Sequence, residues 1–536
     1  MPTHRLLVTD EIDPDGLALL RAVPSFEVDE VPTLPADELL RRIGEYDAII
    51  GRSATRISDA LLRAGTRLKV VGRAGVGVDN IALDTATELG VAVINAPAGN
   101  TIAVAELFFG AVIGLLRHVP RADRSMHEGR WERAALMGCE LKGKVLGIVG
   151  LGRIGTAVAV RARAFGMEVV AYDPYIADEA FAAQQVRRMP TLEALLDAAR
   201  IVTLHVPLTD ETRGMIGAAQ LARLGGDAVV ANLARGGVVD EVALVEALRS
   251  DRLGGAVLDA YPKEPLTGEH ALRGVPRLLL TPHLGASTVE AQRNVAVDVC
   301  EAVRDALLEG ELSRSINAGG GPEEWRSVRT ALEAAHRLAA VARACLADRG
   351  HRAIDGVTLK VGPDLLGARR VLLSAAAAGA LEGTVEQDRL NLINARAVAG
   401  ARGIELAYSE GGEAPHPRAL EVRLRAGREE FRAGGVAAPD APPRLTRVDR
   451  FHVDVALRSP LIVITNHDVP GVIGRVGTAL GDARVNIAEY HQARVAQGGD
   501  ALAVIAVDGA VDPAVRDVLL GLPDVRTATV VRFGAA

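Results

Sequence analysis

The sequence predicts an α/β protein with two parallel-sheet domains in series, followed by smaller mixed α+β units. Three observations support this fold class. Short apolar segments alternate with helical patterns from residue 5 to about residue 96, the alternation repeats between residues 144 and 280, and a glycine-rich turn opens only the second region. Strands that alternate with helices in this way form parallel sheets covered by helices.

Size and composition fit several ordinary globular domains. A chain of 536 residues corresponds to three or four domains, at roughly 100–200 residues each. Hydrophobic residues make up 49% and aromatic residues only 3%, so the cores must be aliphatic and rich in alanine. The net charge of −7 gives no general attraction to nucleic acid or to acidic membranes, and we expect neither as a partner.

Cysteine usage and one apolar segment bear on location. Cys139, Cys300 and Cys345 lie far apart without a C-x-x-C pair, which argues against disulfides and a zinc site. We therefore expect no metal, and a reducing, cytoplasmic location. The apolar segment 102–116 contains Glu106 and is shorter than the ~20 residues that a membrane span needs. A buried helix between domains is the better interpretation.

The expected elements follow in chain order. In the first region the strands are LLVTD, DAIIGRS, LKVVGRA and VAVINAP, and the helices are DGLALLRAV and ADELLRRIG. In the second region the strands are VLGIVG, MEVVAYD, RIVTLHV, DAVVANLA, GGAVLDA and LLLTPH. A helical stretch at 288–308 could lead the chain back to the first domain. A glycine-rich linker at 318–322, a helix at 323–349 and a small strand–helix–strand unit from about 460 complete the chain.

The glycine turn has G-x-G-x-x-G spacing at Gly150, Gly152 and Gly155. The first glycine permits a tight turn, the second lets the backbone approach a pyrophosphate, and the third lets helix and strand pack closely. Asp173, 21 residues after Gly152, ends the next strand and can accept hydrogen bonds from ribose hydroxyls. Its charge would repel a 2′-phosphate, so the sequence predicts NAD rather than NADP. His205, at another strand end, is expected to line the cofactor pocket, with a purely structural role left open.

Three motifs after the glycine turn each follow a predicted strand, where ligands bind in an open α/β sheet. They are NLARGG (232–237), LDAYPKEP (258–265) and TPHLGAS (281–287). Arg235, Glu264 and His283 should therefore meet in one crevice. Arg235 can hold a substrate carboxylate in a bidentate pair, His283 can take a hydroxyl proton as hydride leaves, and Glu264 can fix the histidine tautomer. This trio suits oxidation of a 2-hydroxy acid.

Several motifs together resemble the D-isomer-specific 2-hydroxyacid dehydrogenase family, and within it the long phosphoglycerate dehydrogenases. The motifs are GRAGVGVDNI (72–81), NAPAGNTIAVAE (95–106), GRW (129–131), ELKGKVLGIVGLGRIG (140–155), AFGMEVVAYDP (164–174), ARGGVVDE (234–241) and TPHLGASTVEAQ (281–292). The resemblance implies the same catalytic trio. It also implies cofactor contacts from Val76, Arg153, Ile154, Asp173, Val206, Leu233, Ala234, Arg235, Asp259, His283, Leu284, Gly285 and Ala286.

The resemblance also implies a domain plan. Residues 1–98 and 288–316 would form a flavodoxin-like substrate domain, into which a Rossmann domain at 99–287 is inserted. Residues 317–450 would form an α+β regulatory domain, and 459–536 a ferredoxin-like ACT domain. The last two expectations rest on RLNLINARAVAGARGIEL (389–406) and NHDVPGVIGRVGTALGDARVNIAEY (466–490).

The implied reaction is oxidation of 3-phospho-D-glycerate to 3-phosphooxypyruvate, the first step of phosphorylated serine biosynthesis. The phosphate requires cations in the cleft. Arg52 and Arg73 follow predicted strands of the first domain, and Asn100 opens the bridging helix. Arg133, just after GRW, would come from a partner subunit of a homotetramer. Tyr261 replaces the phenylalanine that is common in LDAYPKEP, and we expect little effect.

The ACT resemblance implies an amino-acid effector, and L-serine is the expected ligand. Asp468, in the loop after His467, would take the ammonium group, and Asn486 from the neighbouring chain would hydrogen-bond the ligand. A tail that only joins subunits is the alternative.

For the whole chain, two other interpretations remain. One is another D-2-hydroxyacid dehydrogenase such as a glyoxylate/hydroxypyruvate reductase, which usually lacks the C-terminal extension. The other is a non-catalytic NAD-sensing protein like the corepressors built on this fold.

Overall fold

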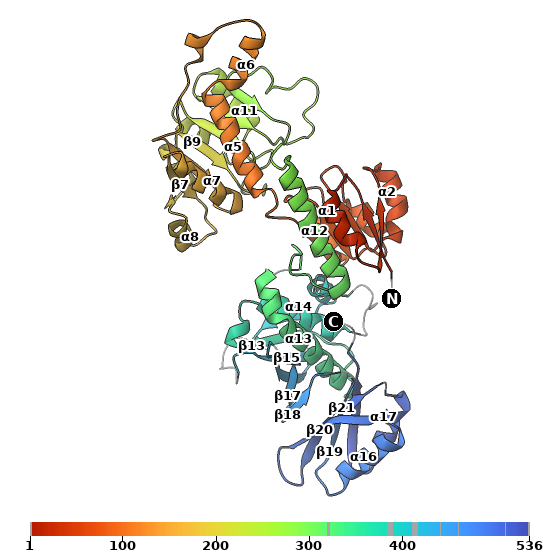
Figure 1. Cartoon of the computed structure of the whole chain (residues 1–536). Helices are drawn as coiled ribbons and strands as arrows, with labels where there is room; N and C mark the ends of the chain where they lie inside the picture. Colours follow the sequence, from red (N-terminus) through yellow and green to blue (C-terminus); the bar gives the residue numbers. More distant parts are fainter. Residues whose placement is uncertain are drawn as a thin grey trace.

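The computed structural model describes residues 3–318, 322–382, 390–409, 416–439, 441–458, 460–509 and 511–533. Residues 319–321 of the expected linker, the first residue of segment 389–406, and residue 459, where the ACT domain was expected to begin, lie outside these ranges. Figure 1 shows the Rossmann unit at the top, the first domain beside its base, the regulatory unit below and the ACT unit at the other end.

The first sheet is parallel and has the order β2-β1-β3-β4-β5, which is a flavodoxin-like order. Its strands are β1 His4–Val8, β2 Phe26–Glu30, β3 Ala48–Gly51, β4 Val70–Arg73 and β5 Ala92–Asn95. The covering helices are α1 Pro14–Arg21, α2 Ala36–Arg42, η1 Ile43–Glu45, α3 Asp59–Ala64 and α4 Leu83–Glu88. The helix predicted at 288–308 is α12 (Val289–Glu309), and it packs against α1 and β4 as expected. The sequence did not predict β2, α3 or α4.

The second sheet has seven parallel strands in the order β12-β11-β10-β9-β6-β7-β8. Counted from β6, this is the Rossmann order with an added edge strand. The strands are β6 Val145–Val149, β7 Glu168–Tyr172, β8 Arg187–Arg188, β9 Ile201–Leu204, β10 Val229–Asn232, β11 Gly255–Leu258 and β12 Leu278–Leu280. The helices are α5 Thr101–Leu116, α6 Val119–His127, η2 Arg133–Leu136, α7 Arg153–Ala164, α8 Asp178–Ala183, α9 Leu192–Ala198, α10 Ala218–Arg223 and α11 Glu241–Arg249.

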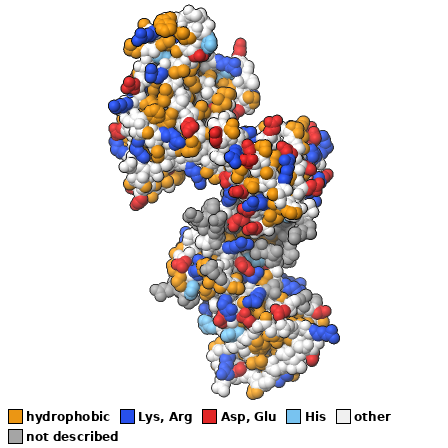
Figure 2. All heavy atoms as spheres, in the orientation of Figure 1, with side chains coloured by type: hydrophobic (Ala, Val, Ile, Leu, Met, Phe, Trp, Pro, Cys, Tyr) orange, Lys and Arg blue, Asp and Glu red, His pale blue; other side chains and the backbone are white. Residues whose placement is uncertain are grey.

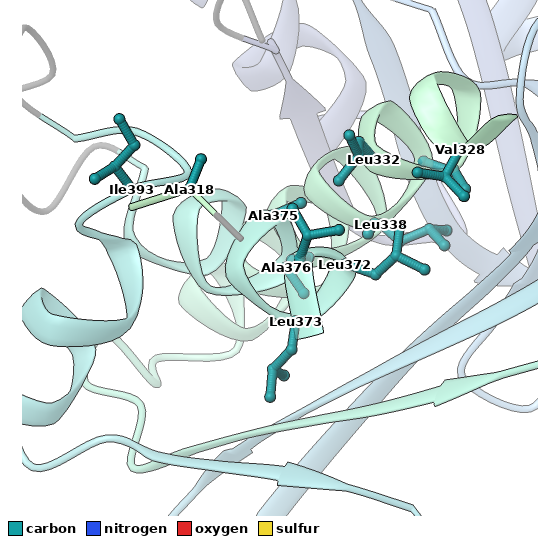
Figure 3. Packing of buried hydrophobic residues seen from close by; sticks show 14 of the residues in the cluster. Ala318, Val328, Leu332, Leu338, Leu372, Leu373, Ala375, Ala376 and Ile393 are labelled. Carbon is teal, nitrogen blue, oxygen red and sulfur yellow. The ribbon is translucent and has the colours of Figure 1, made fainter. Parts of the chain in front are cut away.

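The regulatory unit is a six-stranded sheet, in the order β14-β13-β15-β16-β17-β18, packed against two long helices. Its elements are α13 Pro322–Asp348, β13 Gly356–Val361, η3 Pro363–Leu365, α14 Arg369–Leu381, α15 Ala395–Ala401, β14 Glu405–Tyr408, β15 Ala419–Ala426, β16 Glu429–Val436, β17 Arg444–Val448 and β18 Phe451–Ala456. Figure 3 shows Leu338 of α13 with Leu372 and Ala376 of α14 in the buried cluster. Alanine-rich faces let these two helices approach closely.

The C-terminal sheet is antiparallel with the order β20-β21-β19-β22, the ferredoxin-like arrangement that was predicted. Its elements are β19 Leu461–His467, α16 Val472–Asp482, β20 Asn486–Arg494, β21 Asp500–Asp508, α17 Pro513–Leu520 and β22 Val525–Val531.

None of the helices in the described ranges is, by itself, long and apolar enough to cross a bilayer. Taken together, α5 and α6 are long and apolar enough to span a bilayer, but the chain bends by 62° between them. In this structure one face of α5 is buried against α7 and the Rossmann sheet.

The contact between α13 and α14 yields a stability prediction. A β-carbon on Gly379 of α14 would lie 2.0 Å from the backbone oxygen of His336. We expect Gly379→Ala to lower the free energy of unfolding of the regulatory unit by about 1–3 kcal/mol, because the helices must separate. Gly400, inside α15, has open space at the same position. Gly400→Ala should therefore be neutral or stabilising by about 1 kcal/mol. Equal melting temperatures for the two variants would contradict this account.

Candidate active site

The cofactor loop has the geometry that its three glycines predict. Gly150 follows β6 with φ 90°, a left-handed conformation, and a β-carbon there would lie 2.5 Å from the carbonyl oxygen of His205. Gly152 caps the N-terminus of α7 and faces open space. At Gly155 a β-carbon would lie 2.2 Å from the oxygen of Gly150. The free N–H groups at the start of α7 are thus accessible to an anionic group such as a pyrophosphate.

Asp173 stands at the end of β7, next to this loop. Its carboxylate accepts hydrogen bonds from the backbone N–H of Leu151 (3.0 Å) and of Tyr175 (3.0 Å). Each of these bonds uses a different oxygen. A carboxylate oxygen has more than one lone pair, so Asp173 can also accept from a ribose hydroxyl. Its bond to Leu151 ties the acidic residue to the glycine turn.

Polar atoms that have no partner among the described residues lie after β9 and at the start of α5. They include Nδ1 of His205, Oδ1 of Asn100 and Oγ1 of Thr101. Buried polar atoms are normally hydrogen-bonded, so a ligand is a natural partner for these. Burial lowers the pKa of His205 to about 4, which keeps its imidazole neutral, and Nε2 lies 3.1 Å from the hydroxyl of Thr203. Together with the glycine loop, these atoms fit a bound dinucleotide.

His283 and Glu264 form the pair that the sequence predicts. Nδ1 of His283 lies 2.7 Å from Oε2 of Glu264. The other glutamate oxygen accepts the backbone N–H of Tyr261 at 3.0 Å, so the carboxylate is held from two sides. The side chain of His283 is 48% exposed, which leaves Nε2 free to reach a substrate. This arrangement can hold a proton acceptor in a fixed tautomer.

The turn that carries His283 is held by Asp259, a buried residue at the end of β11. Its carboxylate accepts the backbone N–H groups of Leu284 (2.7 Å) and Gly285 (2.9 Å) and the hydroxyl of Thr281 (2.6 Å). The resemblance implied a cofactor contact for Asp259, which stays a prediction, and the structure places its carboxylate within hydrogen-bonding distance of the turn. Its observed contacts position His283.

Tyr261 connects the same two strand ends. Its hydroxyl lies 3.1 Å from the carbonyl oxygen of Leu258 and 2.9 Å from that of Thr281. Burial raises the pKa of Tyr261 to about 12, so the phenol stays protonated and donates. A phenylalanine, which lacks this donor, could not make either contact.

Arg235 reaches across from the Rossmann unit to the first domain. Its Nε donates to Asp79 at 2.9 Å, and Nη1 donates to the backbone oxygen of Ala234 at 2.7 Å. Asn232 fixes the turn by accepting the N–H of Ala234 and donating to the oxygen of Arg235. A β-carbon at Gly77 would lie 2.1 Å from Nη2, so only glycine leaves room for the guanidinium there. The bidentate contact predicted for Arg235 must therefore use Nη1 and Nη2, unless Asp79 releases Nε.

Asp79 and Asn232 were not singled out from the sequence. Both lie inside motifs that were quoted for other residues. Asp79 is two residues after Gly77, and Asn232 is three residues before Arg235. Asn232 has a readable signal, because it ends a strand just before Arg235. The partnership of Asp79 with Arg235 spans 156 residues and has no local signal.

Arg52 and Arg73 lie close to Arg235 at the ends of β3 and β4. Burial, reinforced by the positive charges of Arg52 and Arg235, lowers the pKa of Arg73 to about 10. Neither Arg52 nor Arg73 forms an ion pair in the part of the chain that the structure describes, and the charges of Asp10 and Asp79 offset the lowering of the Arg73 pKa only in part. Figure 2 shows charged side chains crowded where the first domain meets the Rossmann unit. Three guanidinium groups at one cleft create a site for an anion with several charges.

The remaining residues expected to contact the cofactor lie after the carboxyl ends of strands or at the start of α7. They are Val76, Arg153, Ile154, Val206, Leu233, Ala234, Leu284, Gly285 and Ala286. Asn100 begins α5 at the hinge between the two units. Arg133 lies in η2, which follows α6 in the chain, and Figure 1 shows α6 at the end of the Rossmann unit that faces away from the first domain. Its expected role, as a residue supplied by a second subunit, stays a prediction.

The three expected effector residues all have partners inside the ACT unit. Asp468 accepts from Arg494 (3.0 Å) and from the N–H of Gly498 (3.1 Å), and the hydrogen bond from Arg494 lowers its pKa. His467 contacts Arg526. Asn486 donates to Asp508 at the opposite end of the sheet. A ligand shared by these residues requires two chains.

The low pKa of His205 leads to a pH prediction. Its folded pKa of about 4 lies below the ordinary 6.5, so protonation favours the unfolded state. The stabilisation is complete above pH 6.5 and is lost as the pH falls toward 4, a change on the order of 3 kcal/mol. In His205→Asn this loss should be absent. Melting temperatures of the two proteins should therefore converge or cross as the pH falls from 7 to 4.5.

A matched control is Val242→Asn, at a side chain of α11 that is 77% exposed and carries no titratable group. Its melting curve should stay parallel to that of the unaltered protein at every pH. Parallel curves for His205→Asn as well would contradict a neutral, buried imidazole.

Comparison with known proteins agrees with this geometry. Residues 109–285 match the family described as D-isomer specific 2-hydroxyacid dehydrogenase, NAD binding domain, and residues 461–524 match the ACT domain. A D-3-phosphoglycerate dehydrogenase of Synechocystis is 38% identical over 94% of this chain and 90% of that protein. One of Bacillus subtilis is 36% identical over 97% of this chain and 98% of that protein.

Solved structures resemble the catalytic half. A protein of Thermus thermophilus is 36% identical with a TM-score of 0.53, covering 57% of this chain and 97% of that one. A glyoxylate reductase from Paecilomyes thermophila is 31% identical with a TM-score of 0.55, covering 60% of this chain and 100% of that one. The chain therefore belongs to the D-isomer-specific 2-hydroxyacid dehydrogenase family of NAD-dependent oxidoreductases, in its long, ACT-domain-bearing D-3-phosphoglycerate dehydrogenase branch.

Proposed function

We propose that the protein oxidises 3-phospho-D-glycerate to 3-phosphooxypyruvate with NAD, as the first step of phosphorylated L-serine biosynthesis. The observation that carries the proposal is the grouping of Arg52, Arg73 and Arg235 at strand ends, where the positive charges of Arg52 and Arg235 act on Arg73. The turn after Arg235 abuts the backbone of Tyr261, whose N–H binds Glu264, the partner of His283. The substrate bears a carboxylate and a phosphate. A cleft with three guanidinium groups matches that charge better than it matches an uncharged or singly charged hydroxy acid.

Each residue of the proposed site has one task. Arg235 binds the substrate carboxylate through Nη2 and the second N–H of Nη1, whose first N–H is donated to Ala234, while Arg52 and Arg73 bind the phosphate. His283 Nε2 accepts the proton of the C2 hydroxyl, and Glu264 stabilises the imidazolium that results. NAD, when bound, accepts the hydride from C2. Asp173 would receive the ribose hydroxyls and disfavour a 2′-phosphate.

The catalytic proposal is tested by initial-rate measurements of NADH formation with 3-phospho-D-glycerate, D-glycerate and D-lactate. We expect kcat/KM to be highest for the phosphorylated substrate. His283→Ala should lower kcat by about 10²–10⁴-fold, because the proton acceptor is lost, while NADH binding measured by fluorescence is retained.

A second histidine provides the control. His452→Ala, on the exposed side of the regulatory sheet, should leave the rates unchanged. If His283→Ala retained more than half of the turnover, the assignment of the proton acceptor would be wrong. Equal kcat/KM for phosphorylated and unphosphorylated substrates would instead favour another 2-hydroxyacid dehydrogenase.

The ACT unit suggests regulation by a small molecule, and we propose L-serine as that effector in a cytoplasmic homotetramer. ACT units that pair across subunits would bring Asn486 of one chain to the His467–Asp468 loop of another. Asp468 would then exchange its contact with Arg494 for the ammonium group of serine, and the N–H groups at the start of α16 would bind the carboxylate.

This regulatory proposal predicts that serine inhibits turnover and that Asp468→Asn abolishes the inhibition. The asparagine keeps an oxygen for the N–H of Gly498 but removes the charge that the ammonium group requires. Serine titrations of the rate and of binding heat provide the measurement. Coupling of the usual size, ~1–3 kcal/mol, corresponds to a change of about 5- to 150-fold in substrate affinity.

Asp482→Asn, an exposed residue at the end of α16, serves as the control and should leave the inhibition intact. Absence of both inhibition and binding heat at millimolar serine would show that the ACT unit is structural or recognises another ligand.

A further inference from the structure

A buried hydrogen-bond network closes the crevice between β1 and β3 of the first sheet. In a sheet of this strand order, the β1/β3 crevice is the switch point at which ligands commonly bind. Here it is filled by Asp10, which is 7% exposed. Its carboxylate accepts the hydroxyl of Thr33 (2.7 Å), the N–H of Arg52 (2.7 Å), and the N–H (2.9 Å) and hydroxyl (2.7 Å) of Thr55.

The same turn is held from its other side by Asn80. The amide of Asn80 donates to the carbonyl oxygens of Arg52 (3.0 Å) and Thr55 (2.7 Å). Thr9 adds a contact of 2.9 Å between its hydroxyl and that of Thr55. The backbone N–H and C=O of Arg52 are thus both bound to fixed side chains, so the starting point of its long side chain cannot move.

The backbone near Asp10 is also unusual. Asp10 and Glu11 have φ values of 67° and 52°, in the left-handed region that non-glycine residues rarely adopt. Such conformations cost free energy and persist where the surrounding structure determines them, most often at functional sites. In this chain they bring the carboxylate of Asp10 under the turn that bears Arg52.

We propose that Asp10 and Asn80 are positioning residues that fix the 52–55 turn and so direct Arg52 to the distal anionic group of the substrate. This inference rests on the proposed function, because it assigns the phosphate to Arg52. An arginine side chain loses much rotamer freedom when it binds. A fixed backbone leaves fewer side-chain rotations to be ordered on binding. A misplacement of about 1 Å in such a clamp can lower the reaction rate by as much as 10²-fold.

Steady-state kinetics with 3-phospho-D-glycerate and D-glycerate test the proposal. Asn80→Ala should raise KM for the phosphorylated substrate about tenfold and change kcat by less than about twofold. KM for D-glycerate should hardly change, because that substrate lacks the group that Arg52 binds. Asp10→Asn keeps one acceptor oxygen and should give a smaller rise in KM than Asp10→Ala.

A double-mutant cycle separates positioning from general stability. If Asn80 acts through Arg52, adding Asn80→Ala to Arg52→Ala should have no further effect on KM for the phosphorylated substrate. Additive effects, or equal rises for both substrates, would overturn the proposal. Thr55→Val keeps the shape of a buried residue and removes only its hydroxyl, so it provides the same test if Asn80→Ala does not fold.

Asn317→Ala is the matched control. Its amide bridges backbone and side-chain groups at β5 and α4, away from the 52–55 turn. It should lower the melting temperature without changing the preference for the phosphorylated substrate.

A wild-type protein that is inactive on 3-phospho-D-glycerate would refute the proposed function itself. A wild type that is active, with an Asn80→Ala variant that is unaltered, would refute only the positioning role.

Discussion

The packing of α12 against the first sheet is the contact on which the rest of the active half depends. It joins a returning segment to a domain that the chain left almost 200 residues earlier, so the Rossmann unit is inserted rather than appended. Val295, Val299 and Val303 are fully or nearly fully buried on this helix. A β-carbon at Gly16 would lie 2.7 Å from the backbone of Ala296, so the approach is as close as a helix pair allows. Arg235, which follows β10, binds Asp79, which follows β4, so the carboxyl ends of the two sheets meet at this contact.

Few acidic groups offset the positive charge of the arginine cluster formed by Arg52, Arg73 and Arg235. Asp79 pairs with Arg235, and Asp10 lies under Arg52, but neither neutralises the whole cluster. A buried guanidinium without an acidic partner costs free energy, and the lowered pKa of Arg73 reflects that cost. Under the proposed function, the phosphate of the substrate would offset this cost, because charge-assisted hydrogen bonds to the guanidinium groups would form on binding.

Much of this arrangement could be predicted from the sequence, because its signals are local. The glycine spacing determines a strand, a turn and a helix in one short segment, and Arg235, Glu264 and His283 each follow an apolar strand. The predicted fold class and the ferredoxin-like strand order are confirmed. Two of the strands that the sequence did not predict are polar or very short. β2 reads FEVDE, with acidic residues on an edge strand, and β8 has only two residues.

Other features could not be predicted, because their signals are distant in sequence. The bond between Asp79 and Arg235 and the clamp of Asp259 on the 281–285 turn depend on how separate strand ends meet. Arg133 and Asn486 are a different case, because both were expected to act across subunits, and these roles stay predictions for an assembly of several chains.

The two boundaries of the regulatory unit differ in a way that constrains any signal from the ACT unit. At one boundary the packing is continuous: β18 lies against β20 and β21, and Asp348 of α13 accepts hydrogen bonds from Arg516 and Thr529. At the other, between α13 and the first domain, lies a cavity of about 1170 Å³, lined by polar groups that include Arg67 and His336. The cavity does not separate the two parts completely, because buried side chains of the first domain, α12 and α13 belong to one apolar cluster, and Asn391 donates a 2.7 Å hydrogen bond to the carbonyl oxygen of Gly90. Since close-packed interfaces transmit displacement, a movement of the ACT unit that carries α13 would reach the first domain through these contacts beside the cavity.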